Sequence, residues 1–136
     1  MEKNRVLILC TGNSARSQMA EGLLRHMAGD KFVVESAGVA PSHVRPEAIV
    51  AMDEIGIDIS GHRSKSVNEF IDRQFDYIVT VCDNAKESCP VFPGNATRIH
   101  WSIDDPAAAE GSDETRLEAF RIVREQIRTR LADFKK

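Results

Sequence analysis

One cysteine of this 136-residue chain stands where reactive thiolates occur, at the end of an apolar run. Cys10 follows "VLIL", and the stretch "CTGNSARS" then brings Arg16 and Ser17. A strand-to-helix loop of this kind can turn several backbone N–H groups towards one point and so bind an anion. The N-terminus of the helix adds partial positive charge, and Arg16 can grip a tetrahedral oxyanion through two hydrogen bonds. The same field lowers the pKa of a thiol, so we expect Cys10 to be a thiolate nucleophile that accepts a hydrogen bond from Ser17.

A second interpretation of Cys10 is structural. Cysteine is often a small apolar filler at the end of a buried strand, and a C-x5-R spacing also arises by chance. The loop lacks the G-K-[ST] of nucleotide-binding P-loops, so the sequence does not favour a nucleoside triphosphate as its ligand.

Composition limits the classes of partner. The chain is 42% hydrophobic and 29% charged, with a net charge of −3, which argues against a nucleic-acid partner held by bulk electrostatics. No apolar stretch is long enough for a membrane span or a secretory leader, so we expect no membrane partner. Three cysteines in such a chain indicate reduced thiols rather than a disulfide framework. We therefore expect a soluble cytoplasmic monomer with one domain over residues 1–136.

Apolar runs typical of buried strands alternate with stretches that have helical periodicity. Strands are expected at residues 6–9, 31–38, 76–82 and 97–101. Helices are expected from about Ser17 to Gly29, from Pro46 to Gly56, over a short segment capped by Ser66, and from Ser112 to the C-terminal end. This alternation predicts an α/β fold, a doubly wound four-stranded parallel sheet with helices on both faces.

In such a sheet the residues that bind ligands lie at one edge. Ligands bind outside the carboxyl ends of parallel strands. Cys10 ends the first expected strand and Cys82 ends the third, while Asp104 and Asp105 follow the fourth in "SIDDP". We therefore expect these side chains to lie along the same edge of the sheet.

The string "CTGNSARSQMAE" resembles the phosphate-binding loop and first helix of the low-molecular-weight tyrosine phosphatase superfamily. The resemblance implies a fold of that type, with Cys10 as nucleophile and Arg16 as oxyanion ligand. It also implies that an aspartate directly before proline is the general acid, which here is Asp105. The substrate-binding residues implied by the resemblance are Thr11, Gly12, Asn13, Ser14, Ala15, Arg16 and Ser17.

Two further cysteines, Cys82 and Cys89, make the resemblance more specific within the superfamily. The segments "ESAG", "GIDIS", "VCDNAKESCP" and "DDP" are similar to those of thioredoxin-coupled arsenate reductases within the superfamily. Reduction of arsenate takes two electrons, which a dithiol supplies when it becomes a disulfide. The resemblance implies that Cys10 attacks arsenate and Cys82 then attacks Cys10. Cys89 moves the disulfide to Cys82–Cys89, and thioredoxin reduces it. No organic cofactor is implied.

Two other functions remain open at this point. One is a low-molecular-weight tyrosine phosphatase or a phosphatase of low specificity, since phosphate and sulfate are oxyanions of the same shape. Tyrosine phosphatases of this fold usually carry aromatic residues after the Asp-Pro, whereas Ala107, Ala108 and Ala109 follow it here. The other is a non-enzymatic module that binds oxyanions or senses redox state. A metal site is disfavoured, because the cysteine spacing is not C-x2-C and the four histidines show no ligand pattern.

A cation site is the one departure from the family pattern. Some members of the superfamily bind potassium beside the anion loop, through residues that match Asn13, Glu21 and Ser36 together with an acid. In this chain Lys65, within "HRSKS", stands where the acid would be. We expect its ammonium group to replace the ion, so that potassium activates the protein little compared with sodium.

Overall fold

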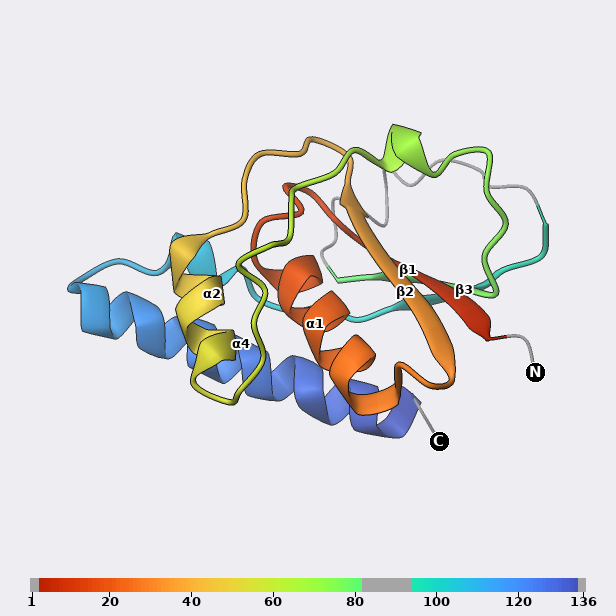
Figure 1. Cartoon of the computed structure of the whole chain (residues 1–136). Coiled ribbons are helices and arrows are strands. Elements are labelled where there is room, and N and C mark those ends of the chain that lie inside the picture. The colour runs from red at the N-terminus through yellow and green to blue at the C-terminus, as the bar shows by residue number, and fades with distance from the viewer. Residues whose placement is uncertain (1–2, 82–93, 135–136) are drawn as a thin grey trace.

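The computed structural model describes residues 3–81 and 94–134 (Figure 1). Four parallel strands form one sheet in the order β2-β1-β3-β4. They are β1 (Asn4–Cys10), β2 (Phe32–Gly38), β3 (Tyr77–Thr80) and β4 (Thr97–His100). The chain passes from β1 to the edge strand β2, then returns across β1 to β3 and the opposite edge, β4. The predicted α/β doubly wound fold is therefore confirmed.

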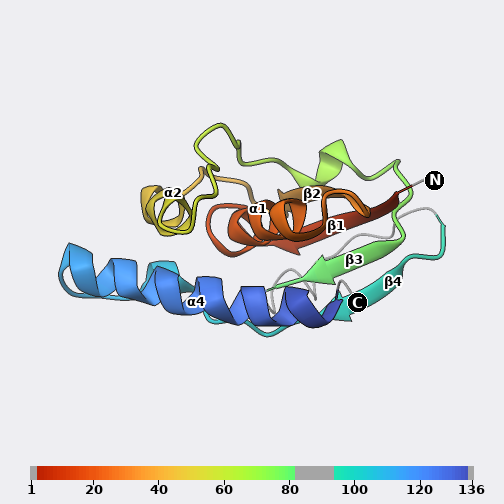
Figure 2. The same cartoon turned by 60° about the horizontal axis from the view of Figure 1, so that its bottom comes forward.

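Within the described residues, three α-helices accompany the sheet. They are α1 (Arg16–Ala28), α2 (Pro46–Asp53) and α4 (Asp113–Phe134). Helix α1 packs on β1 and β2, and α4 packs against both α1 and α2 (Figures 1 and 2). The apolar stripe of α4 faces this core, with Phe120, Val123, Ile127 and Leu131 all buried. That spacing is the one that places side chains on a single helical face.

The helix boundaries follow local chemistry. The Ser112 hydroxyl accepts a hydrogen bond from the backbone N–H of Thr115 at 3.2 Å and so caps α4. Pro46 begins α2, where a missing N–H costs nothing, and Gly56 lies beyond its end with a φ of +80°. The short helix expected after Ser66 is a single 3-10 turn, η1 (Val67–Glu69), because the backbone of Phe70 already leaves the helical region.

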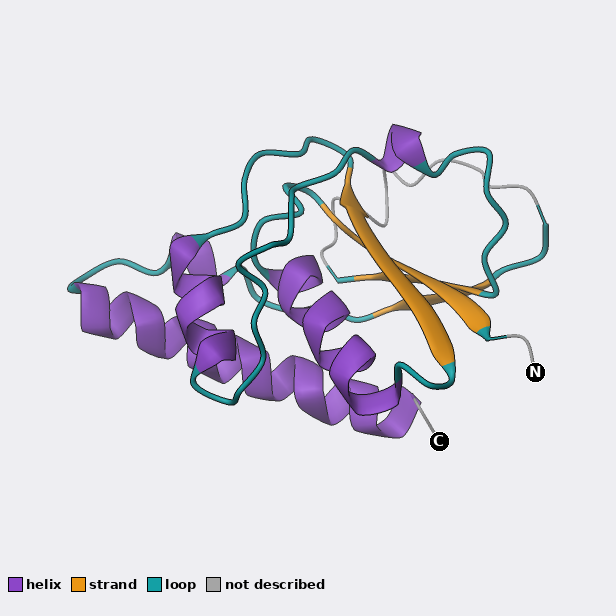
Figure 3. Cartoon of the chain, viewed as in Figure 1, coloured by secondary structure: helices purple, strands orange, loops and turns teal. Residues whose placement is uncertain are grey.

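Strand β1 sits between two partners, which explains why its apolar run is continuous. Val6 to Leu9 are fully buried, as expected of a central parallel strand. The hydrogen bonding between β1 and β3 continues one residue beyond the end of β3, since the Val81 N–H donates to the carbonyl of Leu9 at 2.9 Å. Cys82 and Cys89 lie outside the described residues. Figure 3 shows in teal the loops that follow the carboxyl ends of β1, β2 and β4.

Across residues 3–81 and 94–134, no helix is long and apolar enough to cross a membrane.

Candidate active site

The loop from Cys10 to Ser17 joins β1 to α1 and carries the predicted nucleophile. Cys10 is only 2% exposed, and its Sγ accepts a hydrogen bond from the Ser17 Oγ at 3.3 Å. This is the contact predicted from the sequence, and it stabilises a thiolate. A pocket of about 200 Å³ opens over the loop. It is lined by Cys10, Thr11, Gly12, Ser14, Ala15, Arg16, Ser42, Arg45 and Asp105.

The segment that follows β2 fixes the backbone of this loop. Four of its N–H groups donate to loop carbonyls. The pairs are Val39 to Cys10 at 3.3 Å, Ala40 to Thr11 at 2.9 Å, Ser42 to Gly12 at 3.0 Å, and Arg45 to Ser14 at 2.9 Å. In a trans peptide the C=O and the following N–H point in opposite directions. The loop N–H groups that follow these carbonyls are therefore directed away from residues 39–45, as an anion-binding nest requires.

Gly38 lets the end of β2 approach the loop closely. A Cβ at this position would lie 2.5 Å from the Thr11 carbonyl oxygen and 2.9 Å from the Asn13 backbone nitrogen. Both atoms belong to the backbone, so neither can move aside without changing the loop. Glycine at position 38 is thus a steric requirement of the pocket.

Asn13 adopts a left-handed backbone conformation, with a φ of +48°, and its buried side chain uses every hydrogen-bonding group. Its Oδ1 accepts from the Lys65 backbone N–H at 2.8 Å and from Gln18 Nε2 at 2.9 Å. Its Nδ2 donates to the hydroxyls of Ser17 at 2.7 Å and Ser36 at 3.0 Å. Asn13 therefore holds Ser17, which in turn reaches the sulfur of Cys10.

Glu21, on α1, lies at the centre of the charged groups behind the loop. The Ser36 hydroxyl donates to Glu21 Oε1 at 2.5 Å, and Lys65 Nζ lies 3.4 Å from the same oxygen. Arg25 Nη1 lies 3.0 Å from Oε2, and His62 Nδ1 lies 3.6 Å from it. Although burial alone would raise the pKa of this carboxyl, the Ser36 hydrogen bond and the neighbouring positive charges lower it overall. Glu21 is thus an anion at neutral pH.

His62 responds to the same surroundings in a different way. Burial is the largest influence and lowers its pKa; Glu21 opposes this, Arg25 and Lys65 lower the pKa further, and the net direction is downward. The ring is therefore neutral near pH 7. Its Nδ1 lies 2.9 Å from Gln18 Oε1, and its Nε2 lies 3.4 Å from Arg25 Nη1, which fits a neutral imidazole that donates at one nitrogen and accepts at the other.

The residues expected around a potassium ion contact one another and Lys65 in this structure. Lys65, only 8% exposed, contacts Glu21 directly and also donates to the carbonyl of Arg63 at 3.5 Å. The oxygen atoms of Glu21 are already engaged by side chains of the protein. A lysine ammonium therefore supplies positive charge beside Glu21, and the weak effect of potassium on activity stays a prediction.

Arg16 links the anion loop to the loop that follows β4. Its Nη1 donates to the carbonyl of Ile103 at 2.9 Å, and its Nη2 lies 3.9 Å from Asp105 Oδ2. Asp105 is half-exposed at the pocket mouth, directly before Pro106. Arg16, the predicted oxyanion ligand, and Asp105, the predicted general acid, therefore line the same pocket, although 89 positions separate them in the sequence.

Of the side chains expected at the carboxyl edge, Cys10 and Asp105 line one pocket together with Arg16, whereas Asp104 lines a different pocket and Cys82 lies outside the described residues. Asn13 and Ser17 lie behind the pocket wall, where they brace it. Several residues that shape the site were not predicted from the sequence, namely Gln18, Ser42, Arg45, His62 and Ser64. Among them Ser64 donates to the Gly12 carbonyl at 2.8 Å. Most lie in connections whose path carries no periodic signal.

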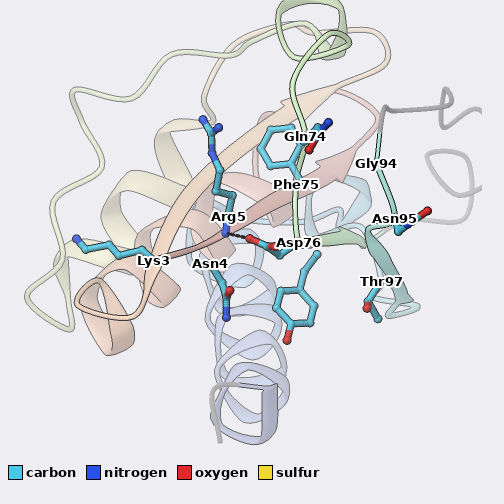
Figure 4. Close-up of a pocket in the computed structure, with 10 residues that line it drawn as sticks. Lys3, Asn4, Arg5, Gln74, Phe75, Asp76, Gly94, Asn95 and Thr97 are labelled. Atoms are coloured by element: carbon cyan, nitrogen blue, oxygen red, sulfur yellow. Dashed lines mark hydrogen bonds between the residues drawn. The ribbon is translucent and has the colours of Figure 1, made fainter. Parts of the chain in front are cut away.

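A larger pocket of about 600 Å³ lies at the opposite edge of the sheet, beside the amino ends of β1, β3 and β4 (Figure 4). Its residues include Arg5, whose backbone N–H donates to Asp76 Oδ2 at 2.7 Å. No cysteine lines it. In the described part of the chain, no three His, Cys, Asp or Glu side chains gather as a metal site would require.

Comparison with known proteins extends the likeness beyond the loop. The chain is 46% identical over 134 residues to an arsenate reductase of Halalkalibacterium halodurans, covering 98% of this chain and 96% of that protein. A solved structure of an arsenate reductase in its phosphate-binding state matches with a TM-score of 0.77 and 34% identity, over 96% of this chain and 95% of the other.

A thioredoxin-dependent arsenate reductase of Corynebacterium glutamicum is also similar, with a TM-score of 0.71 and 28% identity over 98% of this chain and 62% of that one. The family model of low molecular weight phosphotyrosine protein phosphatases matches residues 5–136. A chain with this loop, this sheet and this length of match belongs to the low molecular weight phosphotyrosine protein phosphatase family.

Proposed function

We propose that this protein is an arsenate reductase, which converts arsenate to arsenite through a three-cysteine relay recycled by thioredoxin. The lining of the Cys10 pocket carries the proposal. Its nine described lining residues combine a thiol, guanidinium groups and a carboxylate with small side chains, and none of these nine is aromatic. A pocket of about 200 Å³ built in this way suits an inorganic tetrahedral oxyanion better than a phosphotyrosine ring.

In the first step the Cys10 thiolate attacks arsenic. The backbone N–H groups of residues 11–17 and the guanidinium of Arg16 hold the oxyanion and stabilise the charge that develops on it. Asp105 protonates the departing oxygen, which leaves as water. The product is a covalent adduct between Cys10 and As(V).

In the second step two electrons pass from the thiols to arsenic. The thiolate of Cys82 attacks the Cys10 sulfur, and the electron pair of the sulfur–arsenic bond stays on arsenic, which leaves as arsenite. Two thiols have then become one Cys10–Cys82 disulfide, and As(V) has become As(III). The pairing of Val81 with Leu9 supports this step, because each residue precedes one of the two cysteines.

In the last steps Cys89 attacks Cys82, which restores the Cys10 thiol and leaves a Cys82–Cys89 disulfide for thioredoxin to reduce. The named thioredoxin dependence of the similar C. glutamicum enzyme supports this partner. Because the relay begins from three reduced thiols, we place the protein in a reducing compartment, the cytoplasm. Phosphate and sulfate are expected to compete with arsenate for the loop.

The test of the relay is the Cys82→Ser variant, assayed with arsenate plus thioredoxin and separately with an aryl phosphate. Arsenite release should be abolished, while weak phosphatase activity survives, because phosphoryl transfer needs only Cys10, Arg16 and Asp105. Cys10→Ser is the matched control and should lose both activities. Arsenite release at the wild-type rate in Cys82→Ser would refute the relay.

A single-turnover experiment tests the disulfide shift directly. After stoichiometric arsenate without thioredoxin, mass mapping should find a Cys82–Cys89 bond and an alkylatable Cys10. A Cys10 that stays oxidised would contradict the final transfer. Release of phosphate from aryl phosphates, with no arsenite from arsenate in the wild type, would instead favour a phosphatase.

A further inference from the structure

Arg45 is a second guanidinium on the pocket that contains Cys10 and Arg16. It was not part of the expected site, because it belongs to the connection between β2 and α2. We propose that Arg45 binds the substrate oxyanion together with Arg16 and makes the pocket selective for a doubly charged anion. The inference rests on the proposed function for the identity of the anion, while the pocket itself is independent of it.

The backbone of Arg45 is fixed from two sides. Its N–H donates to the Ser14 carbonyl of the anion loop at 2.9 Å, and its own carbonyl accepts from the N–H groups of Ala48 and Ile49 in the first turn of α2. Its φ of −70° and ψ of 134° are the extended values that a residue before proline prefers, and Pro46 begins α2. The side chain therefore starts from a rigid point beside the loop.

No hydrogen-bond acceptor among the described residues explains the position of the Arg45 guanidinium. Its Nε is buried and makes no hydrogen bond within the described ranges. The comparison is Arg116, whose Nε is also buried without a hydrogen bond but whose Nη2 pairs with Glu47 at 3.0 Å. No carboxylate of residues 3–81 or 94–134 forms such a pair with Arg45. A buried donor without an acceptor is unfavourable unless a ligand supplies one.

The charges of the pocket also indicate that its ligand is an anion. Asp105 lies 3.9 Å from Arg16 and offsets part of its charge, whereas no carboxylate of the described residues pairs with Arg45 on the lining. Arsenate carries up to two negative charges near neutral pH, and guanidinium groups match tetrahedral oxyanions in geometry as well as charge. Two arginines on one small pocket thus favour the dianion over singly charged anions.

The experiment measures inorganic phosphate binding, by calorimetry and by protection of Cys10 against iodoacetamide. Arg45→Met should weaken phosphate binding by about 10- to 100-fold, the loss expected for a charge-assisted hydrogen bond. Arg45→Lys should lose less phosphate affinity, because lysine keeps the positive charge although it lacks the planar, two-donor geometry of the guanidinium. Arg128→Met is the matched control: it removes the same charge from the exposed face of α4 and should leave binding within about twofold of wild type.

Stability separates a ligand role from a structural one. Arg45→Met removes a buried donor that lacks an acceptor, so its unfolding midpoint without anion should equal or exceed that of wild type. Phosphate binding unchanged in Arg45→Met, an equal loss in Arg128→Met, or a lowered midpoint that accompanies the loss would each overturn the inference.

Arsenate kinetics distinguish the inference from the proposed function. If arsenite is released, Arg45→Met should raise the KM for arsenate by about tenfold and change kcat much less. If the wild type binds phosphate through Arg45 but never releases arsenite, the inference stands and the reductase proposal fails. If arsenite is released and Arg45→Met leaves KM unchanged, the inference alone is wrong.

Discussion

Two clusters of charged and polar side chains, one buried and one exposed, contrast within the same molecule. The buried cluster, behind the anion loop, comprises Asn13, Gln18, Glu21, Ser36, His62 and Lys65. The surface cluster joins α4 to the end of α2 and comprises Glu54, Glu114, Glu118, Arg121 and Arg124. In the first, every side chain except the partly buried His62 is buried, whereas the carboxylates of the second are 33 to 76% exposed.

Burial gives the two clusters different physical roles. In the buried cluster a missing partner leaves a charge or a donor that water cannot reach, so each contact constrains the next. In the surface cluster Arg121 reaches three carboxylates at 2.6 to 3.1 Å, yet solvent replaces any of them at little cost. The number of ion pairs therefore says less about rigidity than their access to water does.

The largest expected effect comes from breaking the buried cluster at its centre. Glu21→Ala removes the acceptor of Ser36 and the counter-charge of Lys65, whose side chain is 10% exposed. We expect the free energy of unfolding to fall by about 3–5 kcal/mol, the usual cost of leaving one partner of a buried pair. Urea unfolding followed by circular dichroism measures it.

A paired substitution sharpens this result. Glu21→Gln combined with Lys65→Met removes both charges while keeping the volume of each side chain. The double variant should lose less stability than the sum of the two single variants, with a coupling of about 1–3 kcal/mol. Additive losses would show that the two residues act independently.

An intermediate effect is expected from pH. His62 has a pKa below 6.5 in the folded protein, so the unfolded chain binds a proton there first and stability falls as pH drops below about 6.5. Glu21 has a lowered pKa, so a second loss begins as pH falls below about 4.5. Unfolding midpoints from pH 8 to about pH 3 should show both steps, and His62→Gln should flatten the first. A first step of undiminished size in that variant would assign it to other groups.

The smallest effect is expected on the surface. Arg121→Gln removes contacts to Glu54, Glu114 and Glu118, but the unfolding midpoint should shift by no more than about 2 °C. High salt should remove the difference, because exposed pairs are screened. A shift as large as that of Glu21→Ala would overturn the contrast between the clusters.

The sequence predicts the parts of the site that follow strands. Cys10 ends β1 and Asp105 comes shortly after β4, so parallel topology alone brings both to one edge, and the structure confirms it. Arg16 follows from the spacing to Cys10. The roles of Cys82 and Cys89 stay predictions, since both residues lie outside the described ranges.

The parts that sequence reasoning missed come from connections. Arg45 and Ser64 reach the loop because the chain after β2 and the chain before η1 both fold over it, and no periodicity encodes that path. Asn13 carried a usable signal, since an asparagine after glycine in a tight loop tolerates the left-handed backbone that it adopts. The capping pattern at Ser66 indicated a helix start but not that the turn ends at Glu69.

The hydrogen bonds between residues 39–45 and the anion loop have a consequence for transplanting the site. The loop holds its shape only while a second segment occupies its carbonyl groups and Gly38 leaves room for it. A peptide that spans residues 8–22 alone is thus an incomplete unit. Grafting this oxyanion site onto another parallel sheet therefore requires both residues 10–17 and residues 38–45, placed after two adjacent strands.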